Sequence, residues 1–98
     1  MKLDNEELEA TKKLQEKTAD KMFEELDYRK NEDERVIIYD YIQYFNHFRT
    51  FKKISFYKLD KGISLYNYNI TEEMKIDYNL TMQELKAINK KCKELGWL

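Results

Sequence analysis

The chain is poor in the residues that build catalytic, metal or disulfide sites. It contains no proline, two glycines, one cysteine, one histidine and two serines. The single cysteine, Cys92, excludes an internal disulfide and a zinc cluster, so a reducing, cytoplasmic setting is expected. No HExxH, glycine-rich phosphate loop, EF-hand loop or CxxC motif is present. We therefore predict that the protein is not an enzyme and that it holds no metal and no cofactor.

Long apolar runs are also missing. The best run, residues 36–39, is far shorter than the roughly 20 residues that cross a bilayer. The first residues are acidic and polar, unlike those of a signal peptide. We expect no association with a membrane.

Charged and aromatic residues are abundant instead, at 38% and 14% of the 98 residues. The aromatic residues supply enough burial for one domain with a small core. Residues 1–34 hold 7 Lys/Arg against 12 Asp/Glu, a net charge of −5, whereas residues 35–69 hold 6 against 2, a net charge of +4. This asymmetry indicates an acidic helix that complements a basic sheet.

Helical spacing dominates residues 4–28. The apolar stripe is thin until Met22, Phe23 and Leu26, which we expect to dock on the core. The spacing allows either one long helix or two. We predict a helical N-terminal extension over residues 1–17 and a single α+β domain over residues 18–98.

A second helix is predicted at the end of the chain. Thr81 and Glu84 form a capping box, and Gly96 stands where a left-handed residue ends a helix, with Trp97 packing back after it. Lysines 86, 90, 91 and 93 are expected to project away from the apolar stripe. That stripe comprises Met82, Leu85, Ile88, Cys92 and Leu95.

Alternating patterns predict strands at residues 35–44, 52–59 and 62–70, after a polar break at residues 31–34. Residues 74–78 are either a short fourth strand or a crossover. Gly62 is expected to take a positive φ in the turn between the second and third strands. The predicted fold class is α+β in the order α-β-β-β-α. Its three-stranded or four-stranded antiparallel sheet is covered on one face by the N- and C-terminal helices.

The sheet carries the candidate site, because ten of the 14 aromatic residues lie between residues 39 and 68, interleaved with lysines and an arginine. Alternation places the tyrosines and lysines on the face opposite the aliphatic residues. Such faces bind single-stranded nucleic acid by stacking and phosphate contact. The same residues are also ordinary exposed strand residues that pack across strands, which is the interpretation we prefer. The candidate binding residues are Lys53, Tyr57, Lys58, Lys61, Tyr66 and Tyr68.

His47, in a predicted turn among phenylalanines, lacks an adjacent nucleophile and an orienting carboxylate. A structural or surface role is expected for it. Cys92 lies on the apolar stripe of the last helix, where a free cysteine packs as a small hydrophobic residue.

Two segments, TADKMFEELDY (residues 18–28) and LTMQELKAINKKCKELGW (residues 80–97), resemble small uncharacterised proteins carried by phages and integrated elements of low-GC Gram-positive bacteria. In those proteins the position of Asp27 is commonly glycine, and the chain often begins near Thr18. The resemblance implies the cytoplasm of a bacterial host but brings no activity and no site residues.

The same resemblance implies a phage-encoded accessory binding protein. Such a protein would inhibit or redirect a host or host-defence protein by stoichiometric binding, in the manner of an anti-CRISPR protein. The alternative is a module that binds nucleic acid or sequesters a signalling nucleotide on the tyrosine and lysine face of the sheet.

Overall fold

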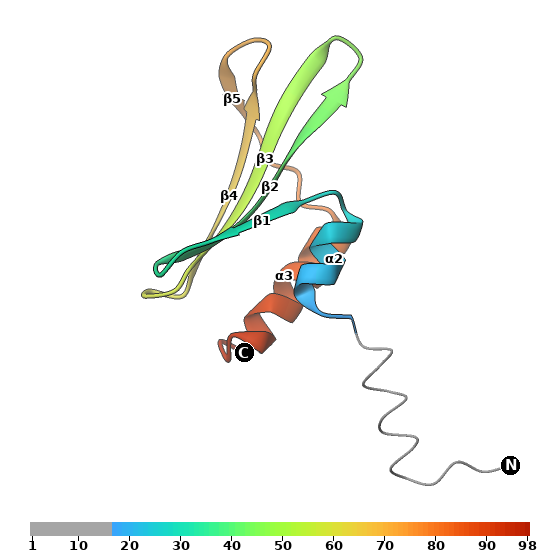
Figure 1. Cartoon of the computed structure of the whole chain (residues 1–98). Coiled ribbons are helices and arrows are strands. Elements are labelled where there is room, and N and C mark those ends of the chain that lie inside the picture. The colour runs from blue at the N-terminus through green and yellow to red at the C-terminus, as the bar shows by residue number, and fades with distance from the viewer. Residues whose placement is uncertain (1–16) are drawn as a thin grey trace, which may run out of the picture.

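The computed structural model describes residues 17–98, which form two helices and five strands (Figure 1). The strands follow one another in the sheet in sequence order, each antiparallel to the next. The predicted α+β class is confirmed. The elements are α2 (Ala19–Glu25), β1 (Arg29–Glu32), β2 (Val36–Phe45), β3 (Phe48–Tyr57), β4 (Gly62–Asn69), β5 (Met74–Ile76) and α3 (Met82–Glu94).

The sheet has five strands rather than the predicted three or four. The short strand allowed at residues 74–78 is present as β5, and the additional strand is β1, which overlaps the predicted polar break. All four residues of β1 are exposed and none is apolar. An exposed edge strand of this kind needs no hydrophobic alternation, because its backbone pairing with β2 holds it in place.

The two long hairpins differ in detail from the prediction. β3 begins at Phe48, four residues early, because Asn46 adopts a φ of 52° and closes a tight turn between Phe45 and Phe48. Asparagine tolerates this left-handed conformation better than most residues. In the next turn Lys61, with a φ of 57°, takes the positive φ that was predicted for Gly62, and Gly62 is the first residue of β4.

The first described helix starts at a defined cap. Thr18 has an extended backbone (φ −72°, ψ 160°), and its hydroxyl accepts a hydrogen bond of 3.1 Å from the Lys21 N–H. An extended residue cannot continue a helix, so a single helix over residues 4–28 is wrong. The predicted extension, apart from Lys17, lies outside the described residues.

α2 and α3 end in the same hydrogen-bonding pattern. After α3, the Trp97 N–H donates to the Cys92 carbonyl (2.8 Å) and the Gly96 N–H to the Lys93 carbonyl (3.1 Å). Gly96 has a φ of 75°, which confirms the predicted Schellman ending. After α2, the equivalent bonds come from Tyr28 and Asp27, and Asp27 adopts a φ of 71°. The predicted capping box of Thr81 and Glu84 is present as well.

The left-handed residues that end α2 and α3 predict opposite changes in stability when glycine is introduced at position 27 and when it is removed at position 96. Asp27→Gly should stabilise the protein by about 0.5 kcal/mol, because relief of left-handed strain exceeds the added entropy of the unfolded chain. Gly96→Ala should destabilise it by about 1 kcal/mol. No atom lies within 4 Å of an added Cβ at Gly96, so the cost is backbone strain and not a clash. Urea unfolding followed by circular dichroism measures both changes; effects of the same sign would contradict the assignment.

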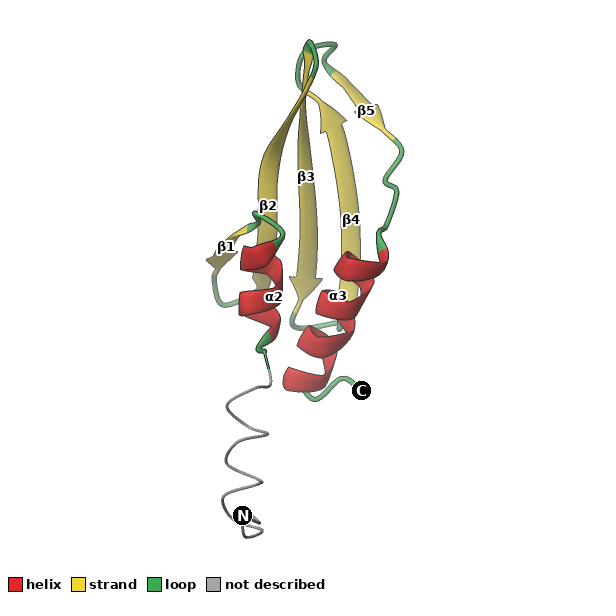
Figure 2. Cartoon of the chain, turned by 90° about the vertical axis from the view of Figure 1, so that its right-hand side faces the viewer, coloured by secondary structure: helices red, strands yellow, loops and turns green. Residues whose placement is uncertain are grey.

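The core lies between the two helices and one face of the sheet (Figure 2). The ring of Phe23 stacks on Tyr39 at a centroid distance of 4.0 Å and meets Phe56 edge-on. Aromatic residues therefore supply much of the buried volume. The buried core comprises Phe23, Tyr28, Ile37, Tyr39, Ile54, Phe56, Ala87, Ile88 and Cys92.

The buried stripe of α3 is rotated from the predicted one. Met82 is 65% exposed and Leu85 is also exposed, whereas Lys91, expected at the surface, is buried. Lys91 faces α2 because its ammonium lies 3.4 Å from the carboxylate of Asp20. The ion pair between α3 and α2 therefore buries Lys91, which helical periodicity alone had assigned to the solvent-exposed side of α3.

The helices cover only the lower part of the sheet, while the β2–β3 hairpin and the β4–β5 end extend above them (Figures 1 and 2). Every residue from Ile42 to Arg49 is exposed. The upper part of the sheet is therefore uncovered on the face where the helices lie.

Candidate binding face of the sheet

The face of the sheet opposite the helices, here the open face, follows from the strand register. Residues paired across antiparallel strands share a face, and Ile37, Tyr39, Ile54 and Phe56 face the helices. The residues between them lie on the open face. They are Arg29 and Asn31 on β1, Val36, Ile38, Asp40, Ile42 and Tyr44 on β2, Arg49, Phe51, Lys53, Ser55 and Tyr57 on β3, Ser64, Tyr66 and Tyr68 on β4, and Lys75 on β5.

Four of the candidate binding residues lie on this face. Lys53 is paired with Tyr66 across β3 and β4. Tyr68 follows two residues later on the same side of β4. Tyr57, at the lower end of β3, is 41% exposed. The structure therefore places these four side chains on the face opposite the aliphatic residues, as the alternation in the sequence predicted.

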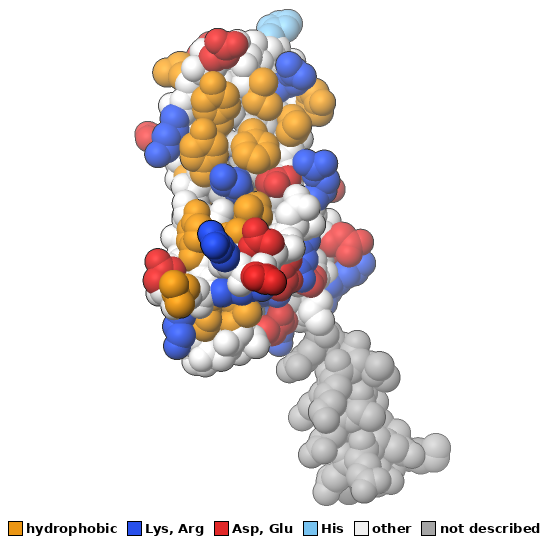
Figure 3. Space-filling model, turned by 60° about the vertical axis from the view of Figure 1, so that its left-hand side comes forward, with side chains coloured by type: hydrophobic (Ala, Val, Ile, Leu, Met, Phe, Trp, Pro, Cys, Tyr) orange, Lys and Arg blue, Asp and Glu red, His pale blue; other side chains and the backbone are white. Residues whose placement is uncertain are grey.

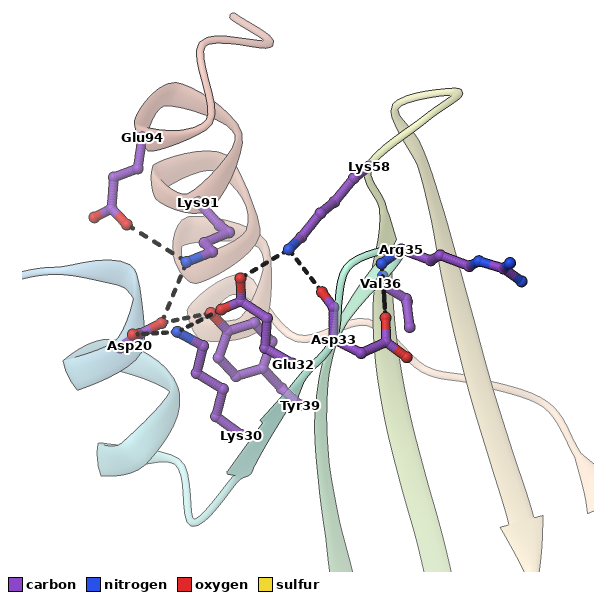
Figure 4. Close-up of polar contacts among 10 residues, drawn as sticks. All are labelled: Asp20, Lys30, Glu32, Asp33, Arg35, Val36, Tyr39, Lys58, Lys91 and Glu94. Carbon is purple, nitrogen blue, oxygen red and sulfur yellow. Dashed lines mark hydrogen bonds and ion pairs between the residues drawn. The ribbon is translucent and has the colours of Figure 1, made fainter.

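The other two candidates, Lys58 and Lys61, are not part of the face. The ammonium of Lys58 binds the Glu32 carboxylate (2.9 Å) and the Asp33 carbonyl (2.7 Å), which ties the end of β3 to β1 (Figure 4). Lys61 is exposed in the turn before β4. Lys58 therefore has a structural role in closing the β1–β2 end of the sheet.

An aromatic cluster occupies the part of the open face formed by β3 and β4. The rings of Tyr66 and Tyr68 are parallel within 7°, with centroids 6.2 Å apart, and Phe51 meets Tyr66 edge-on at 6.5 Å. The ammonium groups of Lys53 and Lys75 lie 5.3 and 5.9 Å from the Tyr66 centroid. These are cation–π distances, so the π system of Tyr66 is already engaged within the protein.

Sequence reasoning missed the β2 part of the face. Tyr44 is 73% exposed and Ile42 is 43% exposed. They adjoin Arg49 and Phe51, their cross-strand partners on β3. Figure 3, seen from the side of the open face, shows hydrophobic side chains gathered over its upper part, with basic side chains among them. The alternation of residues 36–44 carried the signal that could have found Ile42 and Tyr44.

A buried polar cluster lies on the helix side, centred on Glu84. Its carboxylate accepts hydrogen bonds from the Tyr28 hydroxyl, the Tyr78 hydroxyl (2.7 Å) and the Thr81 N–H (2.9 Å). The Lys52 ammonium lies 3.2 Å away. Burial acts to raise the pKa of Glu84, but these hydrogen bonds outweigh burial and lower the pKa to about 2. Such a carboxylate is a poor general base near neutral pH, and its role is structural.

A second cluster joins α2, β1 and α3 around Asp20 (Figure 4). Its carboxylate lies 2.8 Å from the Lys30 ammonium, 2.5 Å from the Tyr39 hydroxyl and 3.4 Å from the Lys91 ammonium. Burial acts to raise the pKa of Asp20, but the hydrogen bonds from Lys30 and Tyr39 lower it to about 2. Neither basic partner of Asp20 comes from residues 35–69, the basic segment that was expected to complement the acidic helix, because Lys30 belongs to β1 and Lys91 to α3.

Little else in the described part of the chain offers chemistry. Among residues 17–98, no three potential metal-ligating side chains gather, and no helix is long and apolar enough to cross a membrane. His47 is exposed in the β2–β3 turn. Cys92 is buried in the core, as predicted, and burial raises the pKa of its thiol.

Comparison of the chain with protein-family models, with curated proteins and with solved structures gives no match. The chemistry of the open face is aromatic and aliphatic at the centre and basic around it, which suits binding.

Proposed function

We propose that the protein is an accessory binding protein that inhibits or redirects a host or host-defence protein by stoichiometric binding through the open face. The observation that carries the proposal is the upper part of the open face, where Ile42 and Tyr44 are exposed beside Phe51 and the Tyr66–Tyr68 pair. Contiguous exposed hydrophobic groups on a soluble domain commonly mark a protein-binding surface.

The composition of the face supports a protein partner. Interface centres are enriched in tyrosine, phenylalanine and arginine, and all three are present here as Tyr44, Phe51 and Arg49. Tyrosine also supplies large contact area at a low cost in conformational entropy. A rigid sheet holds these groups in place, so little ordering would be needed on binding.

The assignment to a host or defence protein rests on the resemblance of residues 18–28 and 80–97 to phage and integrated-element proteins. These segments form α2, α3 and their ends, which support the sheet and do not belong to the open face. The resemblance therefore bears on biological context, while the face bears on the mode of action.

Nucleic-acid or nucleotide binding is the second candidate, favoured by Arg49, Lys53 and Lys75 around the aromatic rings. Stacking platforms for bases need free ring faces. Here Tyr66 is stacked with Tyr68 and flanked by two ammonium groups. A base would have to displace these neighbours, so the geometry favours a protein partner.

Substitution of the face should separate a functional surface from an ordinary one. Affinity capture with the full chain from host cells should give one predominant protein at a stoichiometric ratio. Tyr57→Ala and Tyr66→Ala should each weaken that complex about tenfold, equivalent to about 1.4 kcal/mol per residue. Leu59→Ala is the control, because Leu59 is 97% exposed in a turn outside the face. Equal binding by all variants, with melting temperatures unchanged, would contradict the proposal.

The same variants test the second candidate. Fluorescence anisotropy with labelled single-stranded DNA, RNA and cyclic dinucleotides should show weak or no binding at low salt. Tight binding that weakens steeply with salt and requires Tyr66 would instead assign the face to nucleic acid or a nucleotide.

A further inference from the structure

The upper half of β2 has a free edge. β1 pairs with β2 only from Ile37 to Asp40, because β1 begins at Arg29, the partner of Asp40. Residues 41–45 of β2 therefore have β3 on one side and no described strand on the other, as Figures 1 and 2 both show. Further along, the edge ends at the β2–β3 turn.

Backbone groups at this edge point outward. The Asp33 N–H bonds the Val36 carbonyl on the β1 side, and the Lys58 N–H bonds the Arg35 carbonyl on the β3 side. Hydrogen-bonding direction alternates along an antiparallel strand, so Ile42 and Tyr44 direct their N–H and C=O groups to the free edge. These groups have the geometry to pair with another strand.

The edge lacks the devices that normally prevent such pairing. Natural edge strands carry lysine or proline, contain a bulge, or are very short. Residues 41–45 read Tyr-Ile-Gln-Tyr-Phe, without charge or proline, and their pairing with β3 is continuous without a bulge. An uncharged segment can meet a second copy of itself without like charges opposing one another.

We propose that a second copy of the chain pairs with this edge in antiparallel orientation, with the two-fold axis at Gln43. Ile42 then lies opposite the partner's Tyr44, and Tyr44 opposite the partner's Ile42. Each pair exchanges both backbone hydrogen bonds, because both residues direct these groups outward. The register uses the whole free edge. Tyr41 follows Asp40, the last residue of β2 that pairs with β1, and it lies opposite the partner's Phe45, the last residue before the β2–β3 turn of that chain.

A groove at the edge supports this register. It has a volume of about 640 Å³ and is lined by residues that follow α2, by the first residue of β1 and by residues from both faces of β2: Leu26, Asp27, Arg29, Tyr41, Ile42, Gln43 and Tyr44. Phe45 lies on the helix side of β2 and is 60% exposed. In the proposed register the partner's Phe45 stands over Tyr41, within this groove. Each chain thus carries both the inserting side chain, Phe45, and the groove that receives it, as an isologous two-fold contact requires.

Dimer formation would enlarge the open face that is available to a bound host or defence protein. An axis perpendicular to the sheet leaves the open faces of both copies on the same side, so that Ile42 and Tyr44 of the two chains join the faces into one surface. The dimer does not depend on the proposed function, and a monomer could still bind a partner through a single open face.

The test is the mass of the purified full chain in solution, measured by light scattering after size exclusion. The parent should have twice the mass of the chain. The double variant I42K/Y44K should be monomeric with an unchanged melting curve for secondary structure, because both side chains are exposed. Leu59→Lys, the matched control, should remain dimeric. A monomeric parent at high micromolar concentration would overturn the proposal.

A charge-reversal experiment fixes the register. The double variant I42E/Y44E should also be monomeric alone. Mixed with I42K/Y44K it should form a heterodimer, because position 42 of each chain opposes position 44 of the other. A dimer that persists in either double variant, or a mixture that stays monomeric, would show that the chains do not pair at this edge.

Discussion

The Glu84→Gln variant is expected to have a free energy of unfolding about 3 kcal/mol below that of the parent at neutral pH. Glutamine keeps the size of the side chain and one acceptor oxygen for the Thr81 N–H. It removes the negative charge that faces the Lys52 ammonium at 3.2 Å. Lys52 is 8% exposed, so its charge would be left buried without a counter-charge. Urea unfolding at pH 7 measures the loss.

Two controls show whether the loss comes from the unpaired charge. The double variant K52M/E84Q should recover at least half of it, because no buried charge then remains. Glu25→Gln should change stability little, since the pair of Glu25 with Lys17 is exposed. If Glu84→Gln and Glu25→Gln unfolded alike, the buried carboxylate cluster would not contribute as its geometry indicates.

The ends of α3 could be predicted from the sequence because their interactions are local. Thr81 and Glu84 satisfy each other within one turn, and Gly96 supplies a left-handed residue whatever surrounds it. The same reasoning applies at Asp27, but there aspartate occupies a position that favours glycine. No glycine marks the end of α2, so the helix was predicted to extend to residue 28, whereas α2 ends at Glu25.

β1 and the buried side of α3 could not be predicted, because contacts distant in sequence decide them. β1 owes its conformation to backbone pairing with β2, and Lys91 is buried through Asp20, 71 residues away. Glu84 was recognised as a cap from its spacing alone. Its contacts with Lys52 and Tyr28 bring together strand, loop and helix, and no local pattern encodes them.

The candidate face was predictable in part for a related reason. Alternation within a strand assigns Lys53, Tyr66 and Tyr68 to one side without knowledge of the neighbours. Which side the helices cover, and how far up the sheet they reach, depends on the lengths and positions of α2 and α3. Alternation likewise assigns Ile42 and Tyr44 to the side opposite Tyr39, but only the positions of α2 and α3 show that this side is exposed, at 43% for Ile42 and 73% for Tyr44.

Stability is expected to fall steeply in acid, and Glu84 should account for most of the fall. Its pKa is about 2 in the folded protein against an ordinary value of 4.5. A carboxyl group whose pKa is lowered by folding stabilises the protein fully above its unfolded pKa. That contribution is lost as the pH falls from about 4.5 through about 2. At 1.36 kcal/mol for each pH unit of the difference, the loss is about 3 kcal/mol.

Asp20 changes in the same direction, from an ordinary pKa of 3.8 to about 2, but it is nearly half exposed, so solvent screens its contacts and its share is smaller. Urea unfolding at intervals between pH 7 and pH 2.5 should therefore show a plateau above pH 5 and a decline below it. In Glu84→Gln the plateau should be lower and the decline much shallower, because the titrating group is gone. The two curves should approach each other at the acid end, because below the unfolded pKa of 4.5 the unfolded state of the parent gains stability by binding a proton at Glu84. An equally steep decline in both proteins would place the acid sensitivity elsewhere, with Asp20 and its contacts to Lys30 and Lys91 as the next group to substitute.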